Sequence, residues 1–476
     1  MPVYLLFCHR FFELRFIVVS GILKHLAERG TVTLMLPEDL KDSFRPLIPE
    51  GVTLETSHYK SKLSPLKNLV LNTFGDILYL TFPNTDQLPN ATAQFHRDHY
   101  KPGNRLKYHL VLAMARLASK SPRALRLCTA IYQSLLPKTI HHDLINKISP
   151  DLMIGCSFGL SIEDAAFLAE ARHHNVKSAV IVQSWDRTSN KGYPTIHPDH
   201  ALVWNDIMKQ ECLVHLNFQD DQVHVTGSPL WDEHFNKCEK DKDPSWRSDL
   251  NIPKSAKVLF FSCGGFGSHP ANMQIIPRIF DLARRQPFDD EIYIVFRMYP
   301  QYLSPVTQSG PGKAKKDEIE ALLERYKDEH HIRILYPQVE FDGKNFMPSA
   351  QDHAYMTECL RQCDVSISQV SSQMIEACIF DKPAINMEFG RRVTDKYDLE
   401  IADYKTEHLL RLYRTGAIYR VQTPEQIEPM ISEALNKPDT KKSQRCALVD
   451  QEAPVNRGTA SIATAQTLRS IATTTT

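Results

Sequence analysis

The segment spanning residues 364–386 has the clearest chemical potential in the chain. It reads DVSISQVSSQMIEACIFDKPAIN, so a short apolar strand is followed by Ser371 and Ser372 and then by a helix that contains Glu376. Serine hydroxyls and free backbone N–H groups at a helix start suit a diphosphate, because unpaired donors and the helix dipole both favour negative charge. Glu376 could accept two hydrogen bonds from the diol of a ribose. The same pattern also fits a serine N-cap with a first-turn glutamate in a helix that binds nothing.

A glycine-rich turn is the second candidate for binding phosphate. The sequence SCGGFGS at residues 262–268 follows an apolar strand and contains Gly264, Gly265 and Gly267. Glycine lets the backbone approach a phosphate closely, at the position where α/β domains bind one. The spacing is not GxGxxG, so a dinucleotide site is not indicated, and a tight turn without a ligand is the alternative. Arg297, at the end of a later strand, would place a guanidinium over the same cleft.

The first half of the chain offers a candidate acceptor pocket and two candidate general bases. Trp185, Asp186 and Lys191 follow a strand end and could form a pocket for the hydroxyls of a sugar or another acceptor. We predict Asp186 as the base, since burial beside Trp185 would raise its pKa while Lys191 would lower it. A tryptophan packed beneath a loop is the alternative. His9, at the end of the first strand, is the second candidate base, although a lone histidine is more often structural.

Composition excludes several classes of function. The 476 residues are 42% hydrophobic and 24% charged, which is typical of a soluble globular protein. Lys plus Arg and Asp plus Glu both number 56, so no net field attracts nucleic acid. The closest cysteines, Cys359 and Cys363, lack the spacing of a zinc site. With no paired acidic motif at a strand end, we expect neither a metal nor a cofactor.

The N-terminus predicts a cytoplasmic location. Its apolar run is interrupted by charged residues and lacks a preceding basic region, so it does not read as a signal peptide. No stretch approaches the roughly 20 uninterrupted apolar residues needed to cross a bilayer.

Strand and helix patterns alternate through most of the chain and predict two doubly wound α/β domains. The first begins with a strand at residues 3–8, a helix around residues 19–26 and a strand at residues 31–36. The second begins with the strand at residues 257–262. We place an N-terminal acceptor domain at residues 1–225, a nucleotide-binding domain at residues 226–440, and a C-terminal helix with a frayed tail at residues 441–476.

A helical insertion interrupts the first domain at about residues 60–140. It combines leucines with seven basic side chains: Lys101, Arg105, Lys107, Arg116, Lys120, Arg123 and Arg126. Such a segment could lie on acidic lipid headgroups as a peripheral contact at the inner face of a membrane. The alternative is the solvated face of a packed helix.

Three segments resemble one superfamily. Residues 364–388 resemble the nucleotide-binding segment of GT-B enzymes in the glycosyltransferase and UDP-N-acetylglucosamine 2-epimerase superfamily. Residues 223–232 are similar to its domain junction, and residues 185–192 resemble bacterial members thought to build surface polysaccharides. The likeness covers about residues 150–390.

The resemblance implies roles for individual residues. In the family, the glutamate seven residues before a proline binds the ribose, and Glu376 and Pro383 hold that spacing. The family often has Arg followed by His-Pro at the second strand of this domain, whereas here Tyr299 replaces the histidine. A base after the first strand would correspond to His9, but the usual glycine-rich loop is missing there.

The resemblance implies a GT-B fold, with two Rossmann-like domains facing a cleft. The implied activity is a metal-independent glycosyltransferase that moves a sugar from a nucleotide-sugar donor to the hydroxyl of a carbohydrate or lipid-linked acceptor, in polysaccharide or glycolipid biosynthesis. Three alternatives stay open: a nucleotide-sugar 2-epimerase, a CDP-linked glycerophosphate transferase and a non-catalytic carbohydrate-binding protein. Fold alone does not decide among them.

Overall fold

The chain divides into two compact units. The computed structural model describes residues 1–59, 64–81, 105–159, 161–238, 245–265, 268–303, 310–341, 346–389 and 406–474. Unit 1 contains Met1–Asp232, Thr406–His408 and Ala453–Thr476, and unit 2 contains Glu233–Lys405 and Leu409–Glu452. Residues 441–476, which we expected to form a segment of their own, are thus shared between the two units.

Unit 1 is built on a seven-stranded sheet in the order β3-β2-β1-β4-β5-β6-β7, with all paired strands parallel. In its centre, Leu5 pairs with Thr33 on one side and with Met153 on the other. The strand order reverses between β1 and β4, so the carboxyl ends of these strands form the crevice in which such sheets bind ligands. The strands are β1 (Val3–Phe7), β2 (Thr31–Pro37), β3 (Val52–Ser57), β4 (Leu152–Gly155), β5 (Lys177–Ile181), β6 (His200–Val203) and β7 (Val223–Val225).

The first helical region of unit 1 differs from the sequence prediction. We expected one helix near residues 19–26, but α1 begins at Phe11, only four residues after β1 ends. Gly21, with φ of 77°, then separates α1 from α2 because this left-handed conformation cannot continue a helix. The helices around this sheet are α1 (Phe11–Val19), α2 (Ile22–Ala27), α3 (Glu38–Phe44), α8 (His142–Ile148), α9 (Ile162–His173), α10 (Arg187–Asn190), α11 (Asp206–His215) and α22 (Ala460–Thr473).

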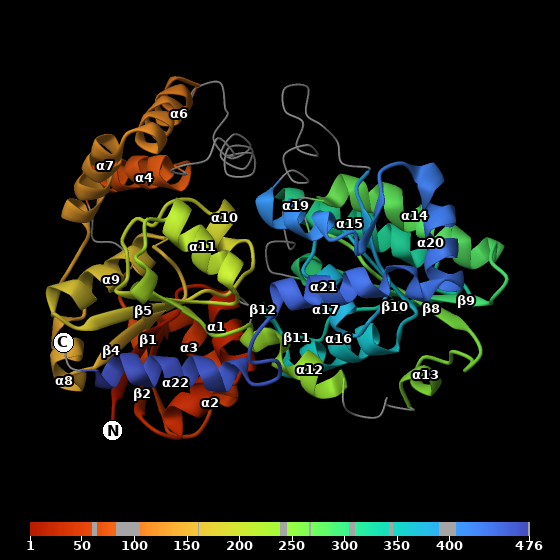
Figure 1. Cartoon of the computed structure of the whole chain (residues 1–476), viewed down its shortest axis with the longest axis horizontal. Coiled ribbons are helices and arrows are strands. Elements are labelled where there is room, and N and C mark those ends of the chain that lie inside the picture. The colour runs from red at the N-terminus through yellow and green to blue at the C-terminus, as the bar shows by residue number, and fades with distance from the viewer. Residues whose placement is uncertain are drawn as a thin grey trace. The chain divides into compact units, whose positions relative to one another are not determined.

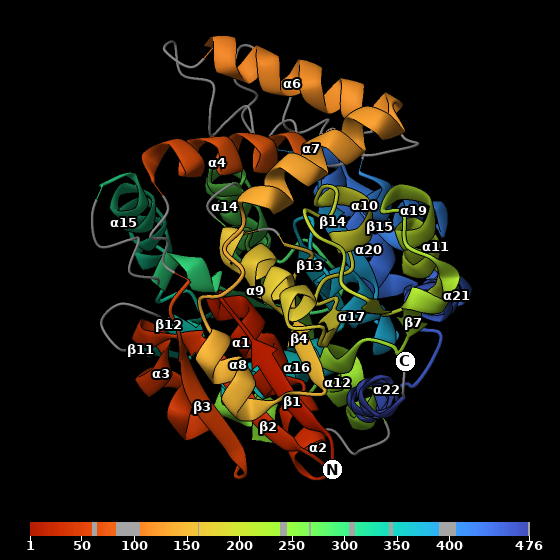
Figure 2. The same ribbon diagram turned by 90° about the vertical axis from the view of Figure 1, so that its left-hand side faces the viewer.

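Three further helices form a separate layer in unit 1. They are α4 (Pro65–Tyr79), α6 (Arg105–Lys120) and α7 (Pro122–Leu135), and each contacts the other two. Ser64 and Ser121 cap the first and last of them, with a proline at the first helical position in both. Figures 1 and 2 show this layer in orange, at one end of the unit.

The C-terminal helix belongs to unit 1 because its apolar side is buried there. Leu468 and Ile471 of α22 are buried, and the helix contacts α2. Asp232 accepts hydrogen bonds from the backbone N–H groups of Ala460 and Ser461, both at 2.8 Å. These hydrogen bonds attach the start of α22 to Asp232, the last residue of the segment Met1–Asp232.

Unit 2 contains a six-stranded parallel sheet in the order β10-β9-β8-β13-β14-β15. The neighbouring strands β8 and β9 are apolar on both faces, as expected of a parallel sheet covered by helices. The order reverses between β8 and β13, which makes their carboxyl ends the expected ligand crevice. The strands are β8 (Lys257–Ser262), β9 (Ile292–Arg297), β10 (Ile332–Leu335), β13 (Val365–Ser368), β14 (Ala384–Met387) and β15 (Ile418–Val421), and a separate hairpin joins β11 (Val339–Phe341) and β12 (Phe346–Pro348).

The helices of this second part of the chain complete a doubly wound arrangement. They are α12 (Asp232–Cys238), α13 (Ser245–Asp249), α14 (His269–Arg285), α15 (Gly310–Glu324), α16 (Ala350–Gln362), α17 (Gln373–Ile379), α19 (Glu407–Arg414), α20 (Ile427–Asn436) and α21 (Lys442–Glu452). Short 3-10 helices occur at η1 (Arg45–Leu47), η3 (Asp220–Gln222), η4 (Pro229–Trp231), η6 (Pro300–Leu303), η8 (Pro424–Gln426) and η9 (Pro438–Lys441). No helix in the described part of the chain is long and apolar enough to span a membrane. The prediction of two doubly wound α/β sheets is confirmed.

Candidate functional site

Two loops at the switch point of unit 2 lie side by side because their strands are neighbours. β8 pairs directly with β13, and the glycine turn follows β8. The side chain of Asn272, which is fully buried in α14, accepts a hydrogen bond from the Gly264 N–H at 3.0 Å and donates one to its carbonyl at 2.7 Å. The helix thus holds the turn in place. Gly267 lies outside the described residues.

The side chain of Gln369, a residue that was not predicted from the sequence, lies against the glycine turn. A Cβ at Gly264 would lie 2.8 Å from Oε1 of Gln369 and 2.6 Å from Cβ of Ser268, so only glycine permits this approach. The Gln369 side chain is 6% exposed, and neither of its amide atoms has a hydrogen-bond partner among the described residues. Leaving such a group unpaired costs about 1–3 kcal/mol, so a ligand that supplies partners would recover this energy. Its one sequence signal is its place directly after a strand.

The loop that follows Gln369 is held in an unusual backbone conformation. Val370 has φ of 43°, which is rare for a β-branched residue and typical of functional loops. The side chain of Asn386, from the neighbouring strand β14, accepts a hydrogen bond from the Val370 N–H at 2.8 Å. Asn386 is fully buried, and it also donates to Glu388 and Tyr413. The surrounding structure therefore enforces the strained turn.

The predicted serine and glutamate residues lie together after this turn. Ser371 Oγ accepts a hydrogen bond from the Gln373 N–H at 3.2 Å, and Ser372 Oγ donates to Oε1 of Glu376 at 2.9 Å. Nε2 of His234 lies 3.9 Å from the second oxygen of Glu376. The helix α17 has only seven residues, so the hydroxyls and the carboxylate, rather than a long helix dipole, are the groups that this segment offers to a ligand.

The guanidinium of Arg297, which we expected over the cleft, is instead bound by a buried carboxylate. Its Nη2 lies 2.5 Å from Oδ2 of Asp352, and both side chains are buried. Asp352 stands at the start of α16, where it also accepts a hydrogen bond from the Gln338 N–H. The ion pair therefore ties the end of β9 to α16. Tyr299, at the position where the family often has histidine, is part-exposed beside Gly265.

Unit 1 contains a pocket of about 590 Å³ at the carboxyl end of its sheet. Its lining comes from the loop after β1 and the start of α1, from the loop after β5, and from the end of α4. The polar side chains that line it are Arg10, Arg15, Tyr79, Gln183, Ser184, Asp186, Arg187 and Lys191. Of the predicted residues, the pocket brings together Asp186 and Lys191, but His9 and Trp185 do not line it.

Asp186 is ionised, because the effect of Lys191 and its other neighbours outweighs that of burial. Burial raises the pKa of Asp186, but Lys191, His408 and the Ser184 hydroxyl together lower it by more. The net pKa is therefore well below the ordinary value. Nζ of Lys191 lies 3.1 Å from Oδ2 of Asp186, and the Ser184 hydroxyl donates a hydrogen bond to Oδ1. A carboxylate held in this way is well placed to orient a hydroxyl but is a weak proton acceptor.

Trp185 supports this loop from beneath. Its side chain is buried, and its ring packs edge-on against His408, with 4.6 Å between ring centroids. The expected contact between Trp185 and an acceptor therefore has no support in the pocket geometry.

The pocket carries a formal charge of +3, because four cations stand against the single carboxylate of Asp186. Arg187 is the most buried of them, at 5% exposed. Its Nη1 donates to the carbonyl of Lys191 at 2.9 Å, and its guanidinium lies 5.2 Å above the Phe158 ring. Nε of Arg187 has no hydrogen-bond partner within the described ranges. Burial lowers the pKa of Arg187 to about 10, so the group is charged at neutral pH and suits an anionic ligand.

His9 lies beside the pocket rather than in it. Its Nε2 is 3.6 Å from Oε2 of Glu163, and its ring stacks against Phe7. The backbone N–H groups of His9 and Arg10 both donate to Oε2 of Glu13 at 3.0 Å. These contacts make His9 part of the scaffold that shapes the start of α1.

The buried Glu13 makes the stability of unit 1 depend on pH. Its side chain is 1% exposed, and burial, together with the nearby Asp164, raises its pKa to about 8. Because folding raises its pKa, Glu13 contributes stability that is fully present below pH 4.5, which is its ordinary pKa. This contribution is lost as the pH rises through about 8.

We therefore expect Glu13→Gln to flatten this pH dependence, since glutamine keeps the hydrogen-bond acceptor without the charge. Melting temperatures measured between about pH 5 and 9 should fall less in the variant, and at high pH the variant should be more stable by roughly 1–3 kcal/mol. Equal slopes for both proteins would show that Glu13 stays ionised in the folded state.

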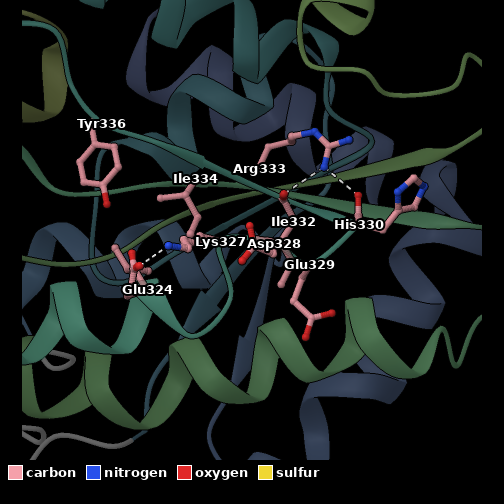
Figure 3. A pocket seen from close by; sticks show the side chains of 10 residues that line it. Glu324, Lys327, Asp328, Glu329, His330, Ile332, Arg333, Ile334 and Tyr336 are labelled. Atoms are coloured by element: carbon pink, nitrogen blue, oxygen red, sulfur yellow. Dashed lines mark hydrogen bonds and ion pairs between the residues drawn. The ribbon is translucent and has the colours of Figure 1, made fainter.

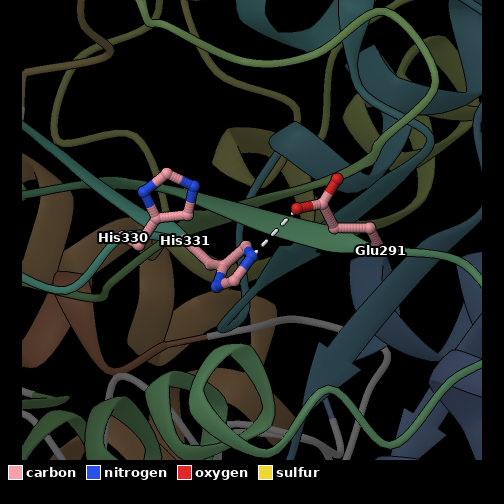
Figure 4. A group of neighbouring side chains, drawn as sticks. All are labelled: Glu291, His330 and His331. Carbon is pink, nitrogen blue, oxygen red and sulfur yellow. Dashed lines mark hydrogen bonds and ion pairs between the residues drawn. The ribbon is translucent and has the colours of Figure 1, made fainter.

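Two other features of unit 2 lie away from the switch point. Glu291, His330 and His331 form a group that could hold a metal ion, with Nε2 of His331 3.0 Å from Glu291 Oε1 (Figure 4). They precede β9 and β10, at the amino ends of these strands, whereas the two loops lie at the carboxyl ends of the sheet.

A pocket of about 420 Å³ lies along the edge strand β10, where Lys327 pairs with Glu324 and Arg333 donates to backbone carbonyls (Figure 3). Neither the candidate metal-binding group nor this pocket includes a residue of the loops after β8 and β13.

Comparison with known proteins gives the fold of the chain. No family model and no curated protein sequence match it. Among solved structures, UDP-GlcNAc 2-epimerase from Neisseria meningitidis, bound to UDP-GlcNAc, is 14% identical with a TM-score of 0.54, over 99% of this chain and 100% of that one. The enzyme from Methanocaldococcus jannaschii is 12% identical over the same shares, with a TM-score of 0.52. A glycosyltransferase from Rickettsia africae is 10% identical, over 100% of this chain and 99% of that one, with a TM-score of 0.49.

The two epimerase structures show that the chain has a two-domain, GT-B-like fold. The predicted GT-B fold is confirmed.

Proposed function

We propose that this chain is a glycosyltransferase that binds a nucleotide-sugar through unit 2 and an acceptor through unit 1. One observation carries the proposal: unit 1 has a charged pocket of its own, in addition to the two loops at the switch point of unit 2. A transferase needs a site for each of two substrates, whereas an epimerase acts on a single one. Asp186 and the cations of the pocket would serve the acceptor.

The donor would be held by the loops after β8 and β13. The unpartnered amide of Gln369 and the hydroxyls of Ser371 and Ser372 are suited to the oxygens of a diphosphate, and the carboxylate of Glu376 to the ribose diol. We take uridine diphosphate as the first nucleotide to test, since a solved protein of the same fold is bound to UDP-GlcNAc. The acceptor oxygen would form a bond to the anomeric carbon as the bond from that carbon to the diphosphate breaks.

The acceptor would carry an anionic group as well as the reacting hydroxyl. Arg10, Arg15 and Arg187 offer guanidinium groups to the same pocket, and guanidinium binds phosphate and carboxylate in a bidentate manner. Asp186 would orient the hydroxyl, and the proton of the hydroxyl would leave to solvent. A phosphate-linked lipid carrying a sugar meets both requirements.

The second candidate is a nucleotide-sugar 2-epimerase, because two solved structures with this fold are UDP-GlcNAc 2-epimerases. Mass spectrometry and chromatography of reactions with UDP-GlcNAc separate the two candidates. An epimerase would form the C2 epimer of the donor without any acceptor, whereas a transferase would release UDP only when an acceptor is present.

A thermal-shift screen against UDP, GDP, CDP and CMP tests the shared requirement first. A bound nucleotide stabilises the folded protein by about 2.7 kcal/mol at a hundred times its Kd. Stabilisation by CDP or CMP alone would favour a CDP-linked glycerophosphate transferase. Absence of any shift at millimolar nucleotide would contradict both nucleotide-sugar enzymes.

Glu376→Ala is expected to weaken nucleotide binding without unfolding the protein. A hydrogen bond to a charged group contributes about 1.5–3 kcal/mol, which corresponds to a loss in affinity of roughly 10- to 150-fold. Calorimetry would measure the change, with Glu428→Ala, an exposed helical glutamate of the same unit, as the matched control. An unchanged Kd would show that Glu376 does not bind the ribose.

A further inference from the structure

The outer face of the helical layer in unit 1 has an exposed apolar stripe. On α6, Leu106 is 75% exposed, Leu110 57%, Met114 37% and Leu117 54%. Their spacing of three and four residues places them on one side of the helix. Leu127 on α7 and Leu66 and Leu69 on α4 are also exposed.

The opposite side of α6 already supplies the packing of this helix. Tyr108, Val111, Ala115 and Ala118 are buried, and α6 contacts both α4 and α7. The stripe is therefore not needed to attach the helix to the protein. Exposed apolar groups that adjoin one another in this way mark a surface for contact with a partner or a membrane.

The charges around the stripe have one sign. Residues 105–142 contain seven Lys or Arg and no Asp or Glu. Arg116, Lys120, Arg123 and Arg126 are exposed on α6 and α7. One of the seven, Lys107, lies 3.8 Å from Asp76 of α4, which offsets a single charge. The face thus combines apolar side chains with an excess of cations, although the whole chain has no net charge.

We propose that the outer face of α6 and α7 binds the surface of an anionic lipid bilayer. The leucines and Met114 would enter the boundary between headgroups and acyl chains, and the cations would lie near lipid phosphates. Nucleic acid would use the cations but not the apolar stripe. A second copy of this chain would have to offer a complementary acidic face.

This surface would also bring acceptors to unit 1, a step that rests on the proposed function. Tyr79 of α4 lines the cationic pocket and also a second pocket of about 500 Å³, which lies between α4, α7 and the loops after β4 and β5. The second pocket includes Asn72 of α4 and Tyr132 of α7. Within unit 1, the helical layer thus lies over the carboxyl end of the sheet (Figure 2). A bilayer bound by the outer face would present lipid-linked acceptors to the unit that holds the cationic pocket.

Cosedimentation of the full chain with vesicles tests the surface directly. We expect binding to vesicles that contain phosphatidylglycerol, little binding to pure phosphatidylcholine, and a steep loss of binding with salt. Leu106→Ser combined with Leu110→Ser, and separately Arg123→Glu combined with Arg126→Glu, should each weaken binding by about tenfold or more. Ile462→Ser on α22, and Lys313→Glu with Lys327→Glu in unit 2, are matched controls that should bind as the parent does.

Several results would overturn the proposal. They are failure to bind anionic vesicles at low salt, equal binding by the variants and the parent, or a concentration-dependent dimer that the same variants abolish. Vesicle binding does not require a nucleotide. A chain that binds vesicles but transfers no sugar would therefore contradict the proposed function alone, and one that transfers sugar to a short-chain acceptor without binding vesicles would contradict this surface alone.

Discussion

Gly265→Val is expected to reduce sugar transfer by about 100-fold or more while leaving most of the fold intact, which corresponds to about 2.7 kcal/mol in the activation free energy. A Cβ at this position would lie 2.9 Å from Oε1 of Gln301 and 3.1 Å from Cε1 of Tyr299. Both atoms are near the ends of side chains that can move aside, so the backbone is not forced apart. The added methyl groups would instead occupy the space beside the glycine turn that the diphosphate needs.

Gly265→Ala provides the graded control, because it adds Cβ without the branched methyl groups. We expect a smaller loss of activity and a melting temperature within a few degrees of the parent. Gly264 is less suitable, since a Cβ there would meet Ser268 and Gln369 at once and would disturb the turn itself. Normal turnover and nucleotide affinity in Gly265→Val would show that the turn does not approach the donor.

Asp186→Asn is expected to lower transfer by about 100-fold or more with nucleotide affinity unchanged, a loss typical of a reacting group that is no longer held in position. The affinity should persist because Asp186 belongs to unit 1, whereas the proposed nucleotide loops belong to unit 2. Its pKa is held well below the ordinary value of 3.8, so it stays ionised as the pH falls toward that value. Any loss of activity between about pH 5 and 7 would therefore come from another group.

The neighbouring Lys191 calls for a second variant. Asparagine leaves the ammonium of Lys191 without the carboxylate that lies 3.1 Å away, so part of the loss could come from a shifted loop. The double variant Asp186→Asn with Lys191→Gln removes both charges and should transfer as poorly as the single variant if the carboxylate acts on the acceptor. Recovery in the double variant would instead identify loop disruption. Unchanged transfer in Asp186→Asn would show that the carboxylate does not act on the acceptor.

Local sequence patterns were sufficient for the doubly wound α/β arrangement of both sheets and for the segment that contains Ser371, Ser372 and Glu376. Apolar strands that alternate with helices can be recognised within short windows, because each element must bury its own apolar face. Once the sheets are parallel and doubly wound, the loops at their carboxyl ends become the candidate sites. The same patterns predicted a basic helical segment with many leucines, but not which of the leucines are exposed.

The three-dimensional arrangement decided what the individual side chains can do. Gln369 faces Gly264, more than a hundred residues earlier in the chain, because β8 and β13 are neighbours. Arg297 is bound by Asp352, a residue that no pattern linked to it. The net pKa of Asp186 depends on the balance among burial, Lys191 and His408, which is far away in the sequence. Hydrophobic periodicity acts over a few residues, whereas burial, charge balance and side-chain pairing depend on distances that only the folded chain defines.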